Sequence, residues 1–121
     1  MVLLWLDDIR DPFDGDWLVF SPIERPFDVV WVKKYHEFTS WIETNGLPDG
    51  ICFDHDLSDI HISKSTYKEK TGYDCAKWLV DYCIDNNKTL PKFNVQSANP
   101  VGKQNIISLL DNFNKHTNEK Q

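Results

Sequence analysis

Acidic residues end two short apolar runs of the sequence, and this placement points to metal chemistry. Asp7 and Asp8 close the first run, and Asp54 and Asp56 close the second. If the runs are neighbouring strands, the carboxyl groups converge, and such a cluster requires protonation, nearby cations or a bound metal. Oxygen-only ligands favour Mg²⁺, with water and phosphate completing its shell. We therefore predict a site for Mg²⁺ or Mn²⁺. The alternative is that Asp7 and Asp8 cap a turn and that Asp56 is a solvated loop acid.

A phosphate site is predicted in residues 96–103, which read QSANPVGK. Ser97 would lie at a strand end on the same edge as the acids, and Pro100 suits the first turn of a helix. That helix would direct free backbone N–H groups, the positive end of its dipole and the Lys103 side chain toward the edge. The alternative is an ordinary strand–turn–helix junction with Ser97 or Asn99 as the N-cap.

His55 stands between two acids, where its protonated form is favoured. It is a candidate general acid or base, or a phosphate contact. Alternatively, it is a strand residue that points into a helix interface. Asp56 is the other candidate for proton transfer. Cys52 precedes these acids, so a Cys–His nucleophile is conceivable, but a mid-strand cysteine more often serves packing.

Length and composition describe one acidic, folded domain. The 121 residues suit a single domain, residues 1–121, with a polar tail from about 115 that we expect to fray. The hydrophobic fraction of 40% provides a core, and the formal charge of -6 gives no general attraction to duplex nucleic acid or an anionic membrane. No apolar run is long enough to span a membrane, and the first residues turn acidic too early for a signal peptide. Three cysteines, at positions 52, 75 and 83, indicate buried free thiols in a reducing cytosol, so we expect a cytoplasmic protein.

The elements that must position these residues are short strands that alternate with helices. Continuous short apolar runs are typical of strands buried on both faces of a parallel sheet. We expect strands at residues 2–6, 29–32, 51–53 and 93–96, and helices with apolar stripes within residues 35–45, 71–83 and 106–113. Thr71 with Asp74 predicts a capping box at one helix start. The stretches 11–28 and 58–70 are too long for plain loops. This alternation predicts an α/β domain with a mostly parallel sheet.

The strand ends resemble those of the receiver domain of two-component response regulators. In that family an acidic pair and a central aspartate hold Mg²⁺, the aspartate accepts phosphate, and a serine or threonine contacts it. By position, Asp7 and Asp8 would be the metal pair. Asp54 would be the phosphoacceptor equivalent, and Ser97 would be the hydroxyl. The resemblance implies a receiver-like (flavodoxin-like) three-layer sandwich with a reduced parallel sheet of about four strands in the order 2-1-3-4.

The finer motifs resemble a divergent branch, the cyclic-phosphate processing receiver-like domains of bacteria and phages. Its motifs follow in the same order between residue 3 and about residue 113: LDDIRDP from Leu6, FDHDL from Phe53, TGYD from Thr71 and SANPVG from Ser97. The resemblance implies a role in handling cyclic phosphate ends of RNA or nucleotides.

The chain departs from the family pattern in ways that affect its chemistry. A fifth strand ending in lysine is not expected, which argues against aspartyl-phosphate signalling. The helix between the first two strands is replaced by the proline-rich stretch 11–28. The branch tends to have histidine where this chain has Gln96, so one candidate acid–base group is missing.

These observations support hypotheses from different functional classes. The first is a Mg²⁺-dependent phosphoesterase, or a protein that binds cyclic phosphate, acting on a phosphorylated small molecule or an RNA end. Its candidate residues are Asp7, Asp8 and Asp54 for the metal, Asp54, His55 and Asp56 for catalysis, and Arg10, Ser97, Asn99, Gly102 and Lys103 for phosphate. The second is a non-enzymatic binding module that senses a nucleotide or docks a partner, with Trp17 and Tyr67 as candidate stacking residues. The third is a phosphoacceptor receiver domain.

Overall fold

The structure, a computed structural model, describes residues 1–54, 70–97 and 99–119. Its elements in chain order are β1 (Val2–Leu6), the 3-10 helix η1 (Trp17–Phe20), β2 (Asp28–Val32), α1 (Tyr35–Asn45), β3 (Gly50–Phe53), α2 (Gly72–Asn86), β4 (Lys92–Val95) and α3 (Pro100–Glu119). Every strand and helix expected from the sequence is present, with ends that move by a few residues. The structure adds η1 within the stretch 11–28, and α3 continues to Glu119, past the point where we expected fraying to begin. None of the described helices is long and apolar enough to cross a membrane.

The strands are parallel and form one sheet in the order β2-β1-β3-β4. This confirms the predicted receiver-like α/β fold and its strand order. The chain moves from β1 outward to β2, then returns past β1 to β3 and β4. Because crossovers between parallel strands are right-handed, this reversal places the β1–β2 connection on one face and α1 and α2 on the other. The carboxyl ends of β1 and β3 therefore flank the point where strand order reverses, which is where such sheets bind ligands.

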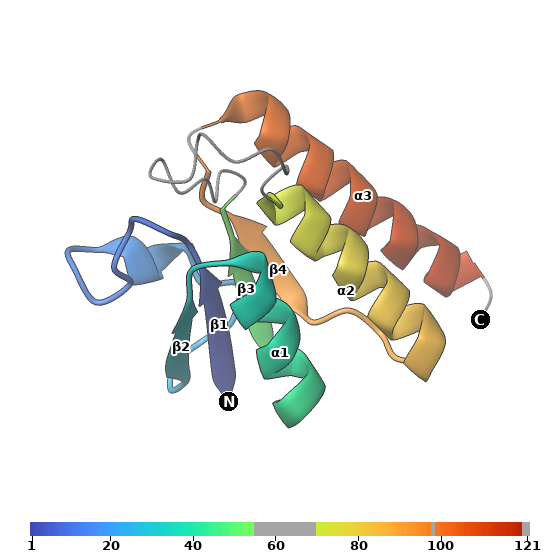
Figure 1. The fold of residues 1–121 in the computed structure, drawn as a ribbon, viewed down its shortest axis with the longest axis horizontal. Coiled ribbons are helices and arrows are strands. Elements are labelled where there is room, and N and C mark those ends of the chain that lie inside the picture. Colours follow the sequence, from blue (N-terminus) through green and yellow to red (C-terminus); the bar gives the residue numbers. More distant parts are fainter. Residues whose placement is uncertain (55–69, 98, 120–121) are drawn as a thin grey trace.

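The three layers are visible in Figure 1, with the helices on one side of the sheet and the blue β1–β2 connection on the other. Successive residues of a strand point to opposite faces. Leu4 and Leu6 of β1 accordingly belong to the core cluster formed with the helices, whereas Leu3 and Trp5 belong to the cluster formed with the connection. Because both faces are covered, the strand reads as an unbroken apolar run.

The layer opposite the helices is an irregular connection, residues 7–27, that contains η1 and no α-helix. Trp17 and Ile23 of this connection pack against the cluster that includes Cys52 of β3. The approach is close, since a Cβ at Gly50 would lie 3.0 Å from Ile23 Cγ2. The first position of β3 therefore accommodates glycine with no crowding, and a larger residue would push the connection away.

Asn94 of the edge strand β4 holds the connection against the sheet. Its Nδ2 donates to the Phe20 carbonyl oxygen at 2.7 Å, and the Cys52 thiol donates to the same oxygen at 3.6 Å. Asn94 Oδ1 accepts from the backbone N–H of Val95 at 2.9 Å. One side chain therefore ties the end of η1 to β4 and also engages a backbone donor of that strand.

The three cysteines are free and buried, as the sequence predicted. Burial raises the pKa of Cys52 to about 12 and the pKa of Cys83 to about 11. Both thiols therefore stay protonated near neutral pH, and a thiol is a poor nucleophile in that form. This agrees with the packing role expected for Cys52.

The start of α2 is fixed by the predicted capping box. Thr71 Oγ1 accepts from the backbone N–H of Asp74 at 3.4 Å, and Asp74 Oδ2 accepts from the backbone N–H of Thr71 at 2.8 Å. The exchange satisfies two donors that a helix start would otherwise leave unpaired.

We expect Thr71→Ala to lower the free energy of unfolding by about 1 kcal/mol, because it removes the side-chain acceptor of the cap. Chemical denaturation of the full chain measures the change. Thr44→Ala is the matched control, since Thr44 is exposed in α1 and alanine has the higher helix propensity. Equal stability of Thr71→Ala and the wild type would contradict the role of the cap.

Candidate metal and phosphate site

The hydrogen-bond ladder of the sheet extends past the strands and sets up the site. The backbone N–H of Asp54 donates to the Leu6 carbonyl oxygen, and the backbone N–H of Gln96 donates to the Phe53 carbonyl oxygen, both at 2.9 Å. The first residues beyond β1, β3 and β4 therefore form one row across the sheet edge: Asp7, Asp54 and Gln96. Since paired residues of parallel strands point to the same face, their side chains are brought to one place.

Asp7 is fully buried, and both of its oxygens are engaged. Oδ1 accepts from the backbone N–H groups of Ile9 at 3.0 Å and Arg10 at 2.9 Å, which fixes the turn after β1. Oδ2 accepts from Arg10 Nη1 at 3.2 Å and from Gln96 Nε2 at 3.5 Å. These donors offset the cost of burying a carboxylate. Asp7 thus caps a turn, as our alternative had it, and also belongs to the acidic cluster.

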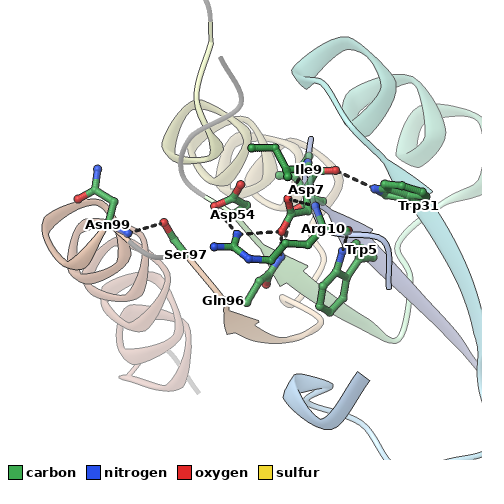
Figure 2. A network of polar contacts seen from close by, with 10 residues as sticks. Trp5, Asp7, Ile9, Arg10, Trp31, Asp54, Gln96, Ser97 and Asn99 are labelled. Atoms are coloured by element: carbon green, nitrogen blue, oxygen red, sulfur yellow. Dashed lines mark hydrogen bonds and ion pairs between the residues drawn. The ribbon is translucent and has the colours of Figure 1, made fainter. Parts of the chain in front are cut away.

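Arg10 is the cation that reaches the row within the described part of the chain. Its Nη1 lies 3.2 Å from Asp7 Oδ2 and 3.7 Å from Asp54 Oδ1, so it bridges the ends of β1 and β3 (Figure 2). The guanidinium also lies over the ring of Trp17, 5.2 Å from its centroid. The turn therefore places a cation beside Asp54 without the strand-end lysine of the receiver pattern.

Asp7, Asp8 and Asp54 each offer a carboxylate oxygen that lies within 4.8 Å of the others. One hard cation with metal–oxygen distances of about 2.0–2.6 Å can bind oxygens at this spacing. The donor set is oxygen only, which fits Mg²⁺ or Mn²⁺. The structure thus brings together the acids that the strand order led us to expect, and the bound ion stays a prediction.

Gln96 is 7% exposed and lies at the end of the row. Its Nε2 donates to the Leu6 carbonyl oxygen at 3.1 Å and to Asp7 Oδ2 at 3.5 Å. These contacts fix the orientation of the Gln96 amide. In the flipped orientation, Oε1 would face the Leu6 carbonyl oxygen and Asp7 Oδ2, which are both acceptors. Its Oε1 has no hydrogen-bond partner among the described residues. Since buried acceptors are normally bonded to protein, water or ligand, Oε1 is available to a donor bound at the site.

The start of α3 shows what the candidate phosphate residues already do. Asn99 Oδ1 accepts from the backbone N–H of Gly102 at 3.0 Å, which makes Asn99 the N-cap. The backbone N–H of Lys103 donates to the Asn99 carbonyl oxygen at 2.8 Å. The Gly102 amide, which we expected to be free for phosphate, is therefore engaged by the N-cap, and the Lys103 amide makes an ordinary helix bond.

Ser97 is placed differently from the other residues of this stretch. Its Oγ accepts from the backbone N–H of Asn99 at 3.1 Å, and a hydroxyl that accepts in this way can still donate its own proton. In Figure 2, Ser97 lies between the acidic row and Asn99. The Ser97 hydroxyl therefore keeps a proton that it can donate, and its contact with a phosphate stays a prediction.

Some candidate residues lie outside the described part of the chain. These are the proton-transfer candidates His55 and Asp56, the stacking candidate Tyr67, and nearly all of the stretch 58–70. Their roles stay predictions. Trp17, the other stacking candidate, is partly buried in the connection and contacts Arg10.

Two tryptophans that the sequence motifs did not single out hold the turn after β1. Trp31 Nε1 donates to the Asp7 carbonyl oxygen at 2.7 Å, and Trp5 Nε1 donates to the Arg10 carbonyl oxygen at 3.0 Å. The signal available in the sequence was general: a buried indole N–H needs an acceptor. That rule does not say which carbonyl oxygen accepts from each indole.

Comparison with known proteins adds a family match. A model of the family described as "Cyclic-phosphate processing Receiver domain" matches residues 2–112. The matched stretch runs from β1 into α3 and includes all the described residues of the candidate site. No curated protein and no solved structure gave a significant match to the chain.

We expect substitutions of Asp7 to separate its role in the turn from its charge. Asparagine keeps an oxygen that can accept from the backbone N–H groups of Ile9 and Arg10, whereas alanine removes it. Without added metal, Asp7→Ala should be less stable than Asp7→Asn by about 2 kcal/mol, at about 1 kcal/mol for each lost bond. Chemical denaturation measures the difference. If the two variants unfold with the same free energy, Oδ1 does not hold the turn.

Proposed function

The chain belongs to the cyclic-phosphate processing receiver family, and on this premise we propose that it binds a divalent cation and, beside it, a cyclic phosphate at the end of a nucleotide or RNA. The observation that carries the proposal is the convergence of the Asp7, Asp8 and Asp54 carboxylates at the point where strand order reverses. Arg10 adds a positive group at the same place. A cation-binding group next to a phosphate-binding group is the arrangement that metal-assisted phosphoryl chemistry requires.

Asp7, Asp8 and Asp54 would hold Mg²⁺ or Mn²⁺. Asp7 would contribute Oδ2, because its Oδ1 is committed to backbone N–H groups of the turn. When bound, the ion would act as a Lewis acid that polarises a phosphoryl oxygen. The formal charge of the protein is -6, so the molecule as a whole does not attract a phosphate. A cation bound at the site would supply that attraction locally.

Arg10 and Ser97 would bind the phosphate oxygens. The Arg10 side chain is 23% exposed, so a ligand can reach the guanidinium from solvent. Hydrogen bonds from a charged donor to a phosphate are stronger than neutral ones. Lys103 is exposed near the start of α3 and adds positive charge, while Asn99 and Gly102 shape the loop that holds Ser97.

Opening a cyclic phosphate consumes water and requires a proton for the departing ribose oxygen. We assign that proton transfer to His55 or Asp56. Binding without turnover is the second candidate, and Gln96 favours it, because an amide does not exchange protons near neutral pH at a position where the resemblance implies histidine. Incubation with a 2′,3′-cyclic nucleotide and Mg²⁺ separates the two functions: a phosphomonoester product shows hydrolysis, and unchanged ligand with measurable binding shows binding alone.

We expect Mg²⁺ to raise the melting temperature of the wild type by several degrees, because an ion that binds only the folded state stabilises it. Asp54→Asn should abolish this effect. Asp85→Asn should keep it, since Asp85 is an exposed acid of α2 outside the cluster. Thermal melts with Mg²⁺, Mn²⁺ or a chelator measure the shift. A wild-type melt that ignores both metals would contradict the proposed metal site.

We also expect a 2′,3′-cyclic nucleotide to bind in the presence of Mg²⁺. Ser97→Ala should weaken this binding by about 1 kcal/mol, which is about fivefold in Kd, and by more if the lost bond is to a charged oxygen. Ser108→Ala is the matched control, because Ser108 is exposed farther along α3 and bonds to Gln104 there. Titration calorimetry measures both variants. Identical affinities for them would remove Ser97 from the phosphate site.

A further inference from the structure

Arg10 combines a fixed backbone with a guanidinium that makes two kinds of contact. Its backbone N–H donates to Asp7 Oδ1 at 2.9 Å, and its carbonyl oxygen accepts from Trp5 Nε1 at 3.0 Å. The guanidinium forms ion pairs with carboxylates, and it also lies over the Trp17 ring. A cation–π contact does not depend on the carboxylates, so Trp17 can retain the guanidinium when the ion pairs are broken.

The guanidinium contacts two carboxylates of the candidate metal cluster, and on Asp7 it contacts the oxygen that a divalent cation needs. Arg10 Nη1 is 3.2 Å from Asp7 Oδ2 and 3.7 Å from Asp54 Oδ1. Asp7 Oδ1 is committed to the turn, so Oδ2 is the oxygen that Asp7 can offer to a metal. A guanidinium and a divalent cation on these oxygens would repel each other at close range. They are therefore competitors for one position.

Gln96 gives a second, independent indication that a ligand belongs here. It is 7% exposed, its Nε2 contacts Asp7 Oδ2, and its Oε1 has no hydrogen-bond partner among the described residues. The Nε2 contact keeps Asp7 Oδ2 oriented when Arg10 moves away. The open acceptor on Oε1 suits a hydrogen-bond donor that arrives with a ligand, such as a coordinated water.

We propose that Arg10 is an exchangeable counter-ion of the acidic cluster. Without a divalent cation, its guanidinium bridges Asp7 and Asp54. When the cation binds these carboxylates, the guanidinium leaves them, stays on Trp17 and becomes available to a phosphate oxyanion. The proposal rests on the function proposed above, because it takes the cluster to be a metal site.

The exchange couples the binding of the cation to the binding of phosphate. Before the cation binds, a phosphate must compete with Asp7 and Asp54 for Arg10 Nη1. Afterwards the guanidinium has no carboxylate partner in the row, so it binds phosphate more tightly. By thermodynamic linkage, phosphate must then tighten the binding of the cation by the same factor.

Side-chain NMR of the wild-type chain tests the movement directly, because the sequence has two arginines, Arg10 and Arg25. Arg25 lies over Phe27, 6.0 Å from the ring centroid, and serves as an internal reference. Titration with Mg²⁺ alone should shift the Arg10 Nε–H signal and leave the Arg25 signal in place. If calorimetry detects Mg²⁺ binding and the Arg10 signal does not move, the exchange is overturned while the metal site stands. If no metal binds, the proposed function fails first.

Substitution of Arg10 gives a second test, because the proposal predicts opposite changes in the affinities for Mg²⁺ and for phosphate. Arg10→Gln removes the competitor, so Mg²⁺ alone should bind at least threefold more tightly than to the wild type. Inorganic phosphate, titrated in saturating Mg²⁺, should bind at least fivefold more weakly. Arg25→Gln should change neither constant by more than twofold. A merely structural Arg10 would weaken both ligands together, and that result would overturn the proposal. Should Arg10→Gln fail to fold by circular dichroism, the wild-type NMR titration decides alone.

Discussion

The register of the parallel sheet is the constraint on which the site depends. Pairing of Trp5 with Cys52 and of Phe53 with Val95 leaves the first residue after each of these strands side by side. Asp7 and Asp54 are therefore held close together by backbone hydrogen bonds, whatever their charges prefer. A slip of one residue would turn these side chains toward the helices and expose apolar ones in their place. The strength of the sheet is thus what allows a cluster of acids to persist at its edge.

The irregular connection after β1 explains how this cluster gains a cation. Here Asp7 takes the N–H groups of Ile9 and Arg10, and the chain turns back at once. The turn brings the Arg10 side chain over the row, and Trp17 from the same connection supports it. This irregular connection therefore supplies both the cation of the site and the ring that lies against it.

The sequence predicted most of the fold because its local and global signals agree. Unbroken apolar runs marked β1 and β3, and Thr71 with Asp74 marked the start of α2. The convergence of the acids followed from strand order, which right-handed crossovers limit to few possibilities. The position of Arg10 could not be predicted in this way, because a turn without a periodic pattern decides where its side chain points.

The start of α3 shows a second limit of the sequence. Ser97 and Asn99 were each possible as the N-cap, since both side chains can accept from a backbone N–H. The structure assigns that role to Asn99, and the amides of Gly102 and Lys103 are consequently used. The choice depends on backbone angles at the junction, which composition does not specify. The contact of Asn94 with Phe20 is similar, because it joins residues far apart in the chain.

Asn94 also affects how readily another chain can pair with the edge of the sheet. Among the strands that the structure describes, β4 is at one edge of the sheet, and such an edge is a template on which another chain can add a strand and start aggregation. The Val95 N–H is directed away from β3, since the flanking N–H of Gln96 is the one that bonds to Phe53. Asn94 Oδ1 already occupies the Val95 donor. An incoming strand would have to break this bond before it could pair with the Val95 N–H, so Asn94 makes this part of the β4 edge a poorer template.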